Sequence, residues 1–471
     1  MSYLPTIGLE VHVELKTKTK MFCSCLNDPG ETHPNVNVCP ICLGHPGTLP
    51  TANKAAVEAV IKLGLALGGK IAKSSHFDRK SYFYPDLPKG YQISQYESPL
   101  VEGGILKDVR IRRVHLEEDT GALTHARDHS LVDFNRAGVP LMELVTEPDI
   151  KNAEEAVAFA RELRLILRYL GISDADMEKG QMRIEANVSV GKGGELGTKV
   201  EVKNINSFKA VHDAIEYELE RQEKLLRGGK KVAQETRGWN EVKGVTESQR
   251  TKEEAHDYRY FPEPDLPPLE LSTSDVDRLK GEIPELPEAK RHRFVEEFGF
   301  NLGDIEVLIE DKAAADFFEE AASELKTYNL KPITYNLLYN YFTSDLKGIM
   351  NDKGSVFEDL RITPEHFAHL AAMIEKGELS SRLAKDILLK MFETGEDPEV
   401  LKREEKLEFI SNEAELELLA KEIIEKNPKA AGDYKKGKEE AVQFLVGQVM
   451  AKTRGQANPE VLKELLKKLL G

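Results

Sequence analysis

IGLEVHVEL, residues 7–15, is the stretch of sequence that decides the fold of the first half of the chain. Its odd-numbered residues are all apolar, and the polar row between them holds Glu10, His12 and Glu14. This alternation predicts a half-buried β-strand, because successive side chains point to opposite faces. Neighbours in the row are about 6.6 Å apart, so Glu10 and His12 can reach one cation. A solvated strand face shows the same alternation.

Further strands with the same design are predicted at residues 109–119, 139–147, 182–190 and 198–204. In the first of them, the doubled Arg112-Arg113 shifts the alternation, as a β-bulge would. The shift leaves Glu118 on the opposite side from Glu117, or in a turn. The polar rows of these strands hold His115, Glu117, Asp119, Glu143, Glu147, Arg183, Glu185, Asn187, Ser189, Lys199, Glu201 and Lys203.

Amphipathic helices are predicted between these strands, at residues 53–68, 152–170 and 208–227. Asn152 and Glu155 form a capping-box pattern at the start of the second helix. The mixture indicates an α+β domain with a largely antiparallel sheet. Helices on one face of the sheet would leave the carboxylate-rich face open as a concave site.

The pattern changes after Pro287, where strand alternation gives way to helical periodicity. We therefore expect a catalytic domain over residues 1–290, an all-helical domain over 291–405 and a small all-helical tail over 406–471. Residues 429–471 carry nine Lys or Arg and five Asp or Glu. This excess of +4 suits contact with a nucleic-acid backbone, although solvated helix faces would also explain it.

The bulk composition restricts the class of protein. The 471 residues carry a net charge of −16, so the chain is not a generic nucleic-acid binder. The N-terminus has no signal-peptide pattern, and no run of 18 apolar residues predicts a membrane span. A cytoplasmic enzyme or enzyme subunit, without membrane contact, is the expectation.

All cysteines lie between residues 23 and 42, as the pairs Cys23/Cys25 and Cys39/Cys42. In a cytosolic protein, two close pairs indicate a tetrahedral metal site rather than disulfides. Four thiolates suit a structural zinc ion. Four reduced cysteines in a loop are the alternative, and His33 or His45 could replace one of the thiolates as a ligand.

Two segments are predicted as irregular binding loops. Residues 79–95, RKSYFYPDLPKGYQISQ, contain Lys80 and Tyr82 among prolines and a glycine, which argue against regular structure. A packed surface loop is equally consistent with this segment. Residues 234–268 contain Arg237 and Arg259, which are candidate phosphate clamps or salt-bridged arginines.

Carboxylates that converge on one sheet face, with lysines and arginines nearby, fit a magnesium–nucleotide site. The sequence has no phosphate-loop motif, no kinase signature set and no nucleotide-binding GxGxxG. All cysteines belong to the cluster, so none is left to be a glutaminase nucleophile. If ammonia comes from glutamine, another chain has to supply it.

These motifs resemble one family, the B subunits of the bacterial tRNA-dependent amidotransferases. The resemblance rests on IGLEVHVEL, the cysteine run with CPICLGHPG, RKSYFYPDLPKGYQISQ, HLEEDTGA, NRAGVPLMELVTEPDI, ANVSV, VEVKNINSF, KEEAHDYRYFPEPDLPP and the tail FLVGQVMAKTRGQANP. It covers nearly the whole chain in order, and its motifs are long and specific.

The resemblance implies a ligase that corrects misacylated Glu-tRNA(Gln) or Asp-tRNA(Asn). ATP phosphorylates the side-chain carboxylate of the amino acid, and ammonia then displaces phosphate to give the amide. An amidase A subunit supplies the ammonia, and a small C subunit ties A to B in a heterotrimer. The B subunit holds the site in a cradle resembling the glutamine synthetase sheet, and its helical domains bind tRNA.

The resemblance also implies roles for individual residues. Lys80, Glu10, His12 and Glu118 would be catalytic, with Glu118 also a candidate gate for ammonia. Many members carry a Cys-Asp pair where this chain has Ile184-Glu185, so the carboxylate here is one methylene longer. The implied magnesium ligands are Glu10, His12, Glu117, Glu118, Glu147, Glu185 and Glu201, and the implied nucleotide contacts are Tyr82, Lys203, Arg237 and Arg259.

Two rival functions are open at this point. A free-standing carboxylate–ammonia ligase for a small acid would explain the carboxylates, but not the helical domains with their basic tail. A non-catalytic tRNA adaptor with a zinc module would explain the cysteines and the tail, but not carboxylates repeated across several strands.

Overall fold

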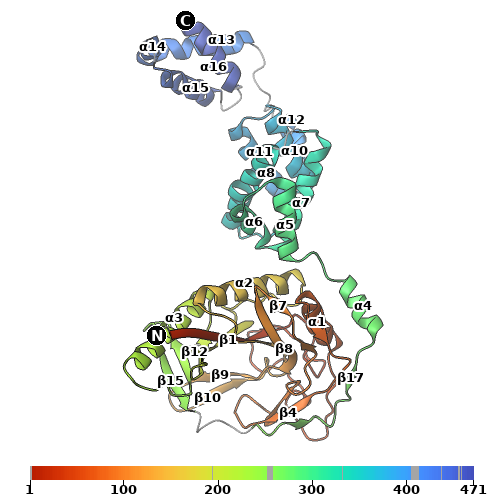
Figure 1. The fold of residues 1–471 in the computed structure, drawn as a ribbon. Coiled ribbons are helices and arrows are strands. Elements are labelled where there is room, and N and C mark those ends of the chain that lie inside the picture. Colours follow the sequence, from red (N-terminus) through yellow and green to blue (C-terminus); the bar gives the residue numbers. More distant parts are fainter. Residues whose placement is uncertain are drawn as a thin grey trace. The chain divides into compact units, whose positions relative to one another are not determined.

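The computed structural model describes the chain except residues 1–2, 194, 252–257, 331–332, 405–412, 436–437, 454–456 and 458. The chain divides into two compact units, Met1–Ala289 and Lys290–Gly471. The first combines a large sheet with helices, and the described part of the second is helical (Figure 1). This arrangement confirms the predicted α+β class.

The first unit is built on a thirteen-stranded sheet. Every strand pair in it is antiparallel except β13–β14, as predicted for a largely antiparallel sheet. The main path runs β15 (Val245–Thr251), β14 (Glu235–Asn240), β13 (Val200–Ile205), β12 (Met182–Lys192), β1 (Tyr3–Glu14), β11 (Pro140–Thr146), β8 (Val109–Glu118), β5 (Tyr91–Ser94), β4 (Asp78–Ser81), β16 (Phe261–Pro262). The short strands β2 (Lys70–Ile71), β6 (Val101–Glu102) and β7 (Ile105–Leu106) attach off this path, and β9 (Ala122–His125) with β10 (Ser130–Asp133) and β3 (Ser74–Ser75) with β17 (Leu269–Glu270) form two separate ribbons.

Strand β1 lies in the middle of this sheet, between β12 and β11. Its apolar row is fully buried, with Val11 and Val13 each 0% exposed. The row packs in one core with helices α1 (Lys54–Ala66), α2 (Ala153–Tyr169) and α3 (Phe208–Arg227). Because these helices pack against the apolar face, the row of Glu10 and His12 points to the other face of the sheet.

Local signals fix these helices where the sequence predicts them. The Asn53 side chain caps α1, and Ser207 caps α3 by accepting from the Ala210 N–H. At α2 the Asn152 side chain accepts from the Glu155 N–H at 2.8 Å, and the Glu155 carboxylate accepts from the Lys151 N–H. These contacts satisfy backbone donors that a helix start leaves unpaired.

The segment 79–95 differs from its prediction. Its ends form the hairpin β4–β5, while Pro85, Pro88 and Gly90 lie in the connection between the two strands. The prolines and glycine therefore do not interrupt the ladder, and the prediction of a wholly irregular loop is wrong. Residues 235–251 likewise form a hairpin, β14–β15.

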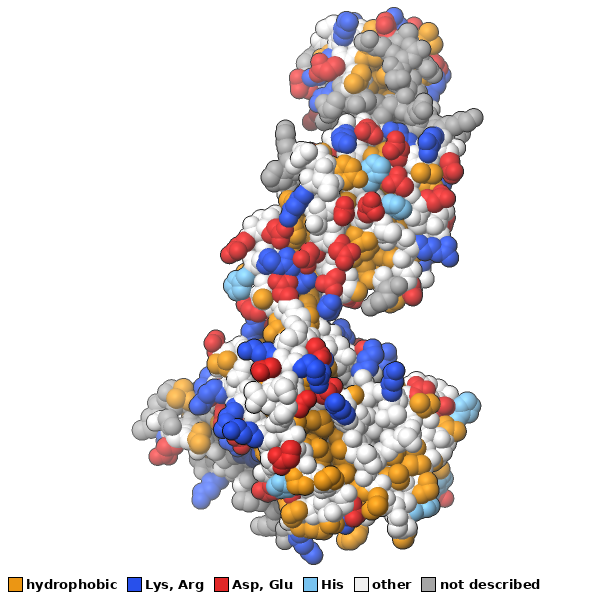
Figure 2. Space-filling view, turned by 90° about the vertical axis from the view of Figure 1, so that its right-hand side faces the viewer, with side chains coloured by type: hydrophobic (Ala, Val, Ile, Leu, Met, Phe, Trp, Pro, Cys, Tyr) orange, Lys and Arg blue, Asp and Glu red, His pale blue; other side chains and the backbone are white. Residues whose placement is uncertain are grey.

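The second unit consists, in its described residues, of helices only. Helix α4 (Thr273–Gly281) still belongs to the first unit, and α5 (Pro287–Phe298) crosses the boundary at residue 290. The helices that follow are α6 (Leu302–Ile309), α7 (Lys312–Thr327), α8 (Ile333–Asn340), a π-helix (Tyr341–Leu346), α9 (Lys347–Lys353), a 3₁₀ turn (Phe357–Asp359), α10 (Pro364–Glu375), α11 (Ser381–Thr394), α12 (Pro398–Glu404), α13 (Glu413–Lys426), α14 (Pro428–Lys435), α15 (Glu440–Lys452), α16 (Pro459–Leu470). Figure 2 shows acidic and basic side chains intermingled on the viewed face of the helical unit, as expected for solvated helices. Among the helices described, none has the length and apolar character needed to cross a membrane.

The last helices have a hydrophobic core of their own. Leu445, Val449, Leu462 and Leu466 are each 0% exposed and belong to one cluster within residues 416–470. The predicted boundary near residue 405 lies outside the described residues. The division of residues 290–471 into a helical domain and a tail domain stays a prediction.

Candidate active site

The open face of the sheet carries a cavity of about 440 Å³. Its lining comes mainly from seven neighbouring strands, β13, β12, β1, β11, β8, β5 and β4. The strand register brings its ionisable residues together, because Glu10 lies directly opposite Glu185 and His12 directly opposite Glu143. The polar rows predicted from separate stretches of sequence therefore meet in one site.

The first of two clusters in this cavity combines His12, Glu117 and Glu143. Their potential ligand atoms lie within 4.8 Å of one another, and His12 Nε2 is 3.6 Å from a Glu143 oxygen. Behind them the fully buried His115 places its Nε2 3.4 Å from both Glu117 and Glu143. Gln92 and Ser94 donate hydrogen bonds to Glu117 at 3.0 and 2.7 Å, which fixes this carboxylate.

The second cluster combines Glu10, Glu185 and Glu201, whose oxygens also lie within 4.8 Å of one another. The Lys203 ammonium is 2.7 Å from Glu185, and Asn187 donates a hydrogen bond to Glu10 at 2.8 Å. The side chain of Glu185, one methylene longer than the Asp of many family members, therefore reaches the carboxylates of Glu10 and Glu201. Lys203, predicted to contact nucleotide, is paired with this cluster.

The electrostatics of both clusters favour a cation. Burial and the neighbouring carboxylates of Glu143 and Glu185 raise the pKa of Glu10, because its charge lacks compensation. Burial also opposes the charge of Glu143, yet His115 and His12 hold the pKa of that carboxyl well below its usual range. Carboxylate oxygens with one imidazole form a donor set that suits Mg²⁺ or Mn²⁺, so the residues fit a divalent metal ion.

Lys80 comes from β4 and also lines this cavity. Burial works against its charge, but the negative charge of Glu117 raises the pKa of Lys80 above its usual range. The ammonium lies 4.9 Å from the centre of the Tyr258 ring. Lys80 is thus a permanently charged group at the His12 cluster.

Two of the predicted magnesium ligands lie outside both clusters. Glu147 follows the end of β11 and forms an ion pair with Arg112 at 2.9 Å. Glu118 lies on the opposite side of β8 from Glu117, as the alternation of a strand requires. The structure does not bring either carboxylate to the site, and Glu143 takes the place predicted for Glu147.

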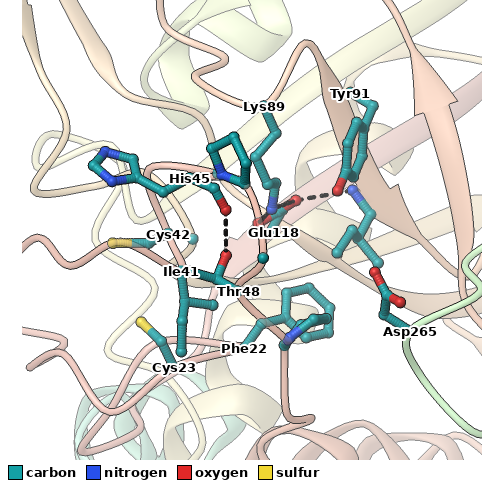
Figure 3. A pocket seen from close by; sticks show the side chains of 16 residues that line it. Phe22, Cys23, Ile41, Cys42, His45, Thr48, Lys89, Tyr91, Glu118 and Asp265 are labelled. Atoms are coloured by element: carbon teal, nitrogen blue, oxygen red, sulfur yellow. Dashed lines mark hydrogen bonds and ion pairs between the residues drawn. The ribbon is translucent and has the colours of Figure 1, made fainter.

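Glu118 instead faces a second cavity, of about 200 Å³ (Figure 3). There it forms a buried ion pair with Lys89 and accepts a hydrogen bond from the Ile93 N–H at 2.9 Å. The thiols of Cys23 and Cys42 line the same cavity (Figure 3). Strand β8 therefore separates two polar cavities with consecutive carboxylates, Glu117 on one side and Glu118 on the other.

Three predicted nucleotide contacts also lie outside the first cavity. Tyr82 does not line it, but its ring packs on Tyr258 at 5.7 Å and its hydroxyl donates to Gln92 at 3.5 Å, and both of these residues do line it. Arg237 is held within β14–β15, where it pairs with Glu235 at 2.7 Å and donates to the Thr246 carbonyl at 2.6 Å. Arg259 is exposed, while its neighbours Tyr258 and Tyr260 line the cavity. Residues 252–257, with His256 and Asp257, lie outside the described residues.

The four cysteines converge as predicted. All four sulfurs lie within 4.8 Å of one another, and those of Cys39 and Cys42 are 3.9 Å apart. A tetrahedral Zn–S site with bonds of about 2.3 Å places its sulfurs about 3.8 Å apart, so the spacing fits zinc. The buried Lys20 ammonium lies 3.9 Å from the Cys42 sulfur, where it balances thiolate charge.

Sequence reasoning missed several residues of the first cavity. Glu143 belongs to the same predicted polar row as Glu147. Only the strand register, which places Glu143 opposite His12, shows that Glu143 is the one in the site. Gln92 and Tyr96 lay in or beside a segment predicted to be irregular. Arg113 follows a predicted bulge. That bulge was the one feature of the sequence that could have indicated to which face of the sheet its side chain points.

The fold and the cavity together define a class, that of α+β proteins with a candidate two-metal site on the open face of an antiparallel sheet. Comparison with known proteins identifies the family within it. A model described as the GatB/GatE catalytic domain matches residues 5–277, and one described as the GatB domain matches residues 316–470. The chain belongs to the GatB/GatE family.

Curated relatives agree with this family over the full length. A protein of Caldanaerobacter subterraneus subsp. tengcongensis, named as the B subunit of an aspartyl/glutamyl-tRNA(Asn/Gln) amidotransferase, is 48% identical over 482 residues and covers 100% of both chains. Proteins with the same name from Persephonella marina and Thermotoga maritima are 46% and 48% identical, and they match 100% of this chain and 100% and 99% of their own.

Proposed function

We propose that this chain is the B subunit of a tRNA-dependent amidotransferase and that it uses ATP to amidate Glu or Asp carried by a misacylated tRNA. The names of its relatives support the reaction, and the cavity with its two carboxylate clusters supports its location. The observation that carries the proposal is the convergence of Glu10, His12, Glu117, Glu143, Glu185 and Glu201 on one open sheet face.

In this proposal the reaction begins with phosphorylation of the substrate carboxylate. Glu10, Glu185 and Glu201 would hold one magnesium ion, and His12, Glu117 and Glu143 the other. Bound Mg²⁺ supplies positive charge to phosphate oxygens, which phosphoryl transfer requires. His115 orients Glu117 and Glu143 from behind, because its Nε2 lies 3.4 Å from each. Lys80 adds a fixed positive charge at the same end of the cavity.

Ammonia would reach the acyl phosphate from a partner amidase subunit. The cavity beside Glu118 and Lys89 is our candidate for the last part of its route, with their ion pair as the gate. A C subunit, tRNA contact through the helical tail, zinc on the four cysteines and a cytoplasmic place of action complete the proposal.

The test substitutes Glu10→Ala and His12→Ala in the assembled enzyme. Each removes one ligand from a different cluster, so ATP-dependent amide formation on Glu-tRNA(Gln) should fall by at least roughly two orders of magnitude. Glutamine hydrolysis by the partner subunit should remain measurable in the same preparations. Normal amidation in both variants would refute the site.

A second arm separates the proposal from its rivals. The wild-type chain is incubated with ATP, ammonium and either Glu-tRNA or free glutamate, with and without the partner subunits. Amide on the tRNA is expected in the complex and, from ammonium, also without the amidase. Amidation of free glutamate would identify a small-acid ligase instead, and tRNA binding without any ATP cleavage would identify an adaptor.

A further inference from the structure

The four cationic side chains that line the first cavity are not equivalent. Lys203 pairs with Glu185 at 2.7 Å, and Arg183 pairs with Asp119 at 2.7 Å. For Lys80 and Arg113, no carboxylate among the described residues lies within 4.0 Å of the charged group. Two of the four cations are therefore held in direct ion pairs, and the other two are not.

Aromatic rings hold these two cations in place. The Arg113 guanidinium carbon lies 4.1 Å from the centre of the Tyr96 ring, and the Lys80 ammonium 4.9 Å from that of Tyr258. Tyr96 in turn stacks on Tyr260, with ring centres 4.9 Å apart and planes at 18°. The face of a ring attracts a cation, but it accepts no strong hydrogen bond. The rings therefore orient the two cations without taking up their N–H donors.

Arg113 has a donor with no partner. Its Nε is buried and has no hydrogen-bond acceptor among the described residues. Buried donors are nearly always satisfied, and each exception calls for an explanation such as a ligand. Because Arg113 lines the cavity, an anion bound there could supply the missing acceptor.

The β-bulge explains how Arg113 comes to face the site. In the pairing of β8 with β11, Arg113 lies opposite Val145 and Ile111 opposite Thr146, so Arg112 is the extra residue. Arg112 turns to Glu147 outside the cavity, whereas Arg113 lines it together with Glu117. The bulge thus assigns two consecutive arginines to two different environments.

The neighbouring groups indicate which anion fits. Glu117, from the His12–Glu117–Glu143 cluster, lines the cavity on the same strand as Arg113, and its charge is the largest attraction felt by Lys80. A phosphoryl group has three oxygens, so it can contact a metal held by that cluster and two cations at once. A carboxylate has two oxygens and a single charge, and it would leave one of these donors unused.

We infer that Arg113, together with Lys80, binds the phosphoryl group that is transferred in the reaction. The inference rests on the proposed function and adds a residue to it. In the step concerned, an oxygen of the substrate carboxylate attacks the γ-phosphorus of ATP. The bond from that phosphorus to the β,γ-bridging oxygen breaks, and ADP leaves with the electron pair, so no proton is transferred. Arg113 contacts the phosphoryl group during its transfer, whereas Tyr96 is a positioning residue that acts through Arg113.

The test compares Arg113→Ala and Arg113→Lys with Arg112→Ala in the assembled enzyme. Calorimetry measures the binding of AMP-PNP and of AMP, each with Mg²⁺. For Arg113→Ala, the AMP-PNP affinity should fall roughly tenfold or more and the AMP affinity should not change, because only AMP-PNP carries the γ-phosphoryl group. ATP cleavage dependent on Glu-tRNA should fall by roughly two to three orders of magnitude. Arg112→Ala should match the wild type in all three measurements.

Arg113→Lys and two variants at Tyr96 protect the test against misfolding. Arg113→Lys keeps the charge but loses the Nε–H donor and the planar contact with Tyr96, so a partial loss of AMP-PNP affinity is expected. Tyr96→Phe keeps the ring and should behave as wild type, whereas Tyr96→Ala should weaken AMP-PNP binding. Melting temperatures within a few degrees of wild type establish that the variants are folded.

Other outcomes would overturn the inference. Wild-type AMP-PNP affinity and ATP cleavage in both Arg113 variants would show that Arg113 binds no phosphoryl group. A raised KM for Glu-tRNA with unchanged AMP-PNP affinity would identify Arg113 as a clamp for the substrate carboxylate instead. Failure of the wild-type enzyme to cleave ATP with Glu-tRNA would refute the proposed function, a result distinct from either of these.

Discussion

Glu143 and Glu147 lie four residues apart in one polar row, yet their carboxylates have different partners. Glu143 is 7% exposed and lies within 3.4 to 3.6 Å of two histidines. Glu147 lies beyond the end of β11 and is bound by Arg112 on the outside. At the scale of single residues, the position relative to the neighbouring strand decides which carboxylate belongs to the site.

This difference predicts opposite results for one substitution. Glu143→Gln keeps the size of the side chain but removes the charge that His12 and His115 face, so amidation should fall by roughly two orders of magnitude. Glu147→Gln loses a surface ion pair worth about 0–1 kcal/mol and should change activity by less than about twofold. Steady-state amidation assays on both variants check the pair. Equal loss in both, or loss only in Glu147→Gln, would contradict the assignment of Glu143.

The polar rows of the strands could be predicted from the sequence. Which residues of each row line the candidate active site could not. Alternation within IGLEVHVEL establishes that Glu10 and His12 share a face, since that is a property of one strand. The alternation cannot show that Glu10 lies opposite Glu185 on β12, because the register depends on two strands and not on one. The same holds for Glu118, which was predicted to lie on the opposite side from Glu117 or in a turn, but whose partner Lys89 was not predicted.

At the scale of elements, the cysteine segment brings its four sulfur atoms together and is tied to residues 132–135 by hydrogen bonds such as Asn35 N–H to Asp133 at 2.9 Å. Within residues 23–42 no helix or strand is described, so few backbone ladders stabilise this segment. Cys23 and Cys42 also line the cavity that holds the Lys89–Glu118 ion pair. A metal ion at the cluster would therefore support the wall of that cavity as well as its own loop.

Zinc analysis tests this element. We expect one zinc ion per chain by mass spectrometry of the native protein, and its loss with a lower melting temperature in Cys39→Ser. His33→Ala should retain zinc, because the His33 ring pairs with Glu31 at 2.9 Å and is not part of the cluster. A metal-free native protein with four freely titrating thiols would contradict the zinc site.

Long elements were predictable from the sequence and short ones were not. Helix α3 runs over residues 208–227, as its periodicity and the following glycines predict. Strands β4 and β5 have four residues each, which leaves two side chains per face and no readable alternation. Strands β4 and β5 form because they pair with each other and with the rest of the sheet. The local sequence of each strand does not predict this pairing.

At the scale of the whole molecule, only the last part of the tail is locally basic in an otherwise acidic chain. Residues 429–471 carry an excess of +4 in a chain of net charge −16. The core within residues 416–470 is formed by the tail's own side chains. The tail can therefore be removed without exposing the core of the catalytic unit, whose buried residues lie before residue 290.

Deletion of residues 407–471 should weaken the binding of tRNA(Gln) and leave ATP binding intact. Loss of the basic residues should also reduce the dependence of tRNA affinity on salt concentration. Filter-binding assays with tRNA at several salt concentrations, with nucleotide calorimetry on the same protein, measure both effects. Unchanged tRNA affinity would remove the tail from the tRNA-binding surface.

The position of β8 between the two cavities has a consequence for the evolution of the family. Between the bulge at Arg112 and Asp119, consecutive residues serve different compartments, so an insertion or deletion of one residue would exchange Glu117 with Glu118. A substitution in this stretch changes one side chain only. A change of length instead moves every following side chain to the other face of the sheet. The number of residues from Arg112 to Asp119 should therefore vary less among relatives than the residues themselves.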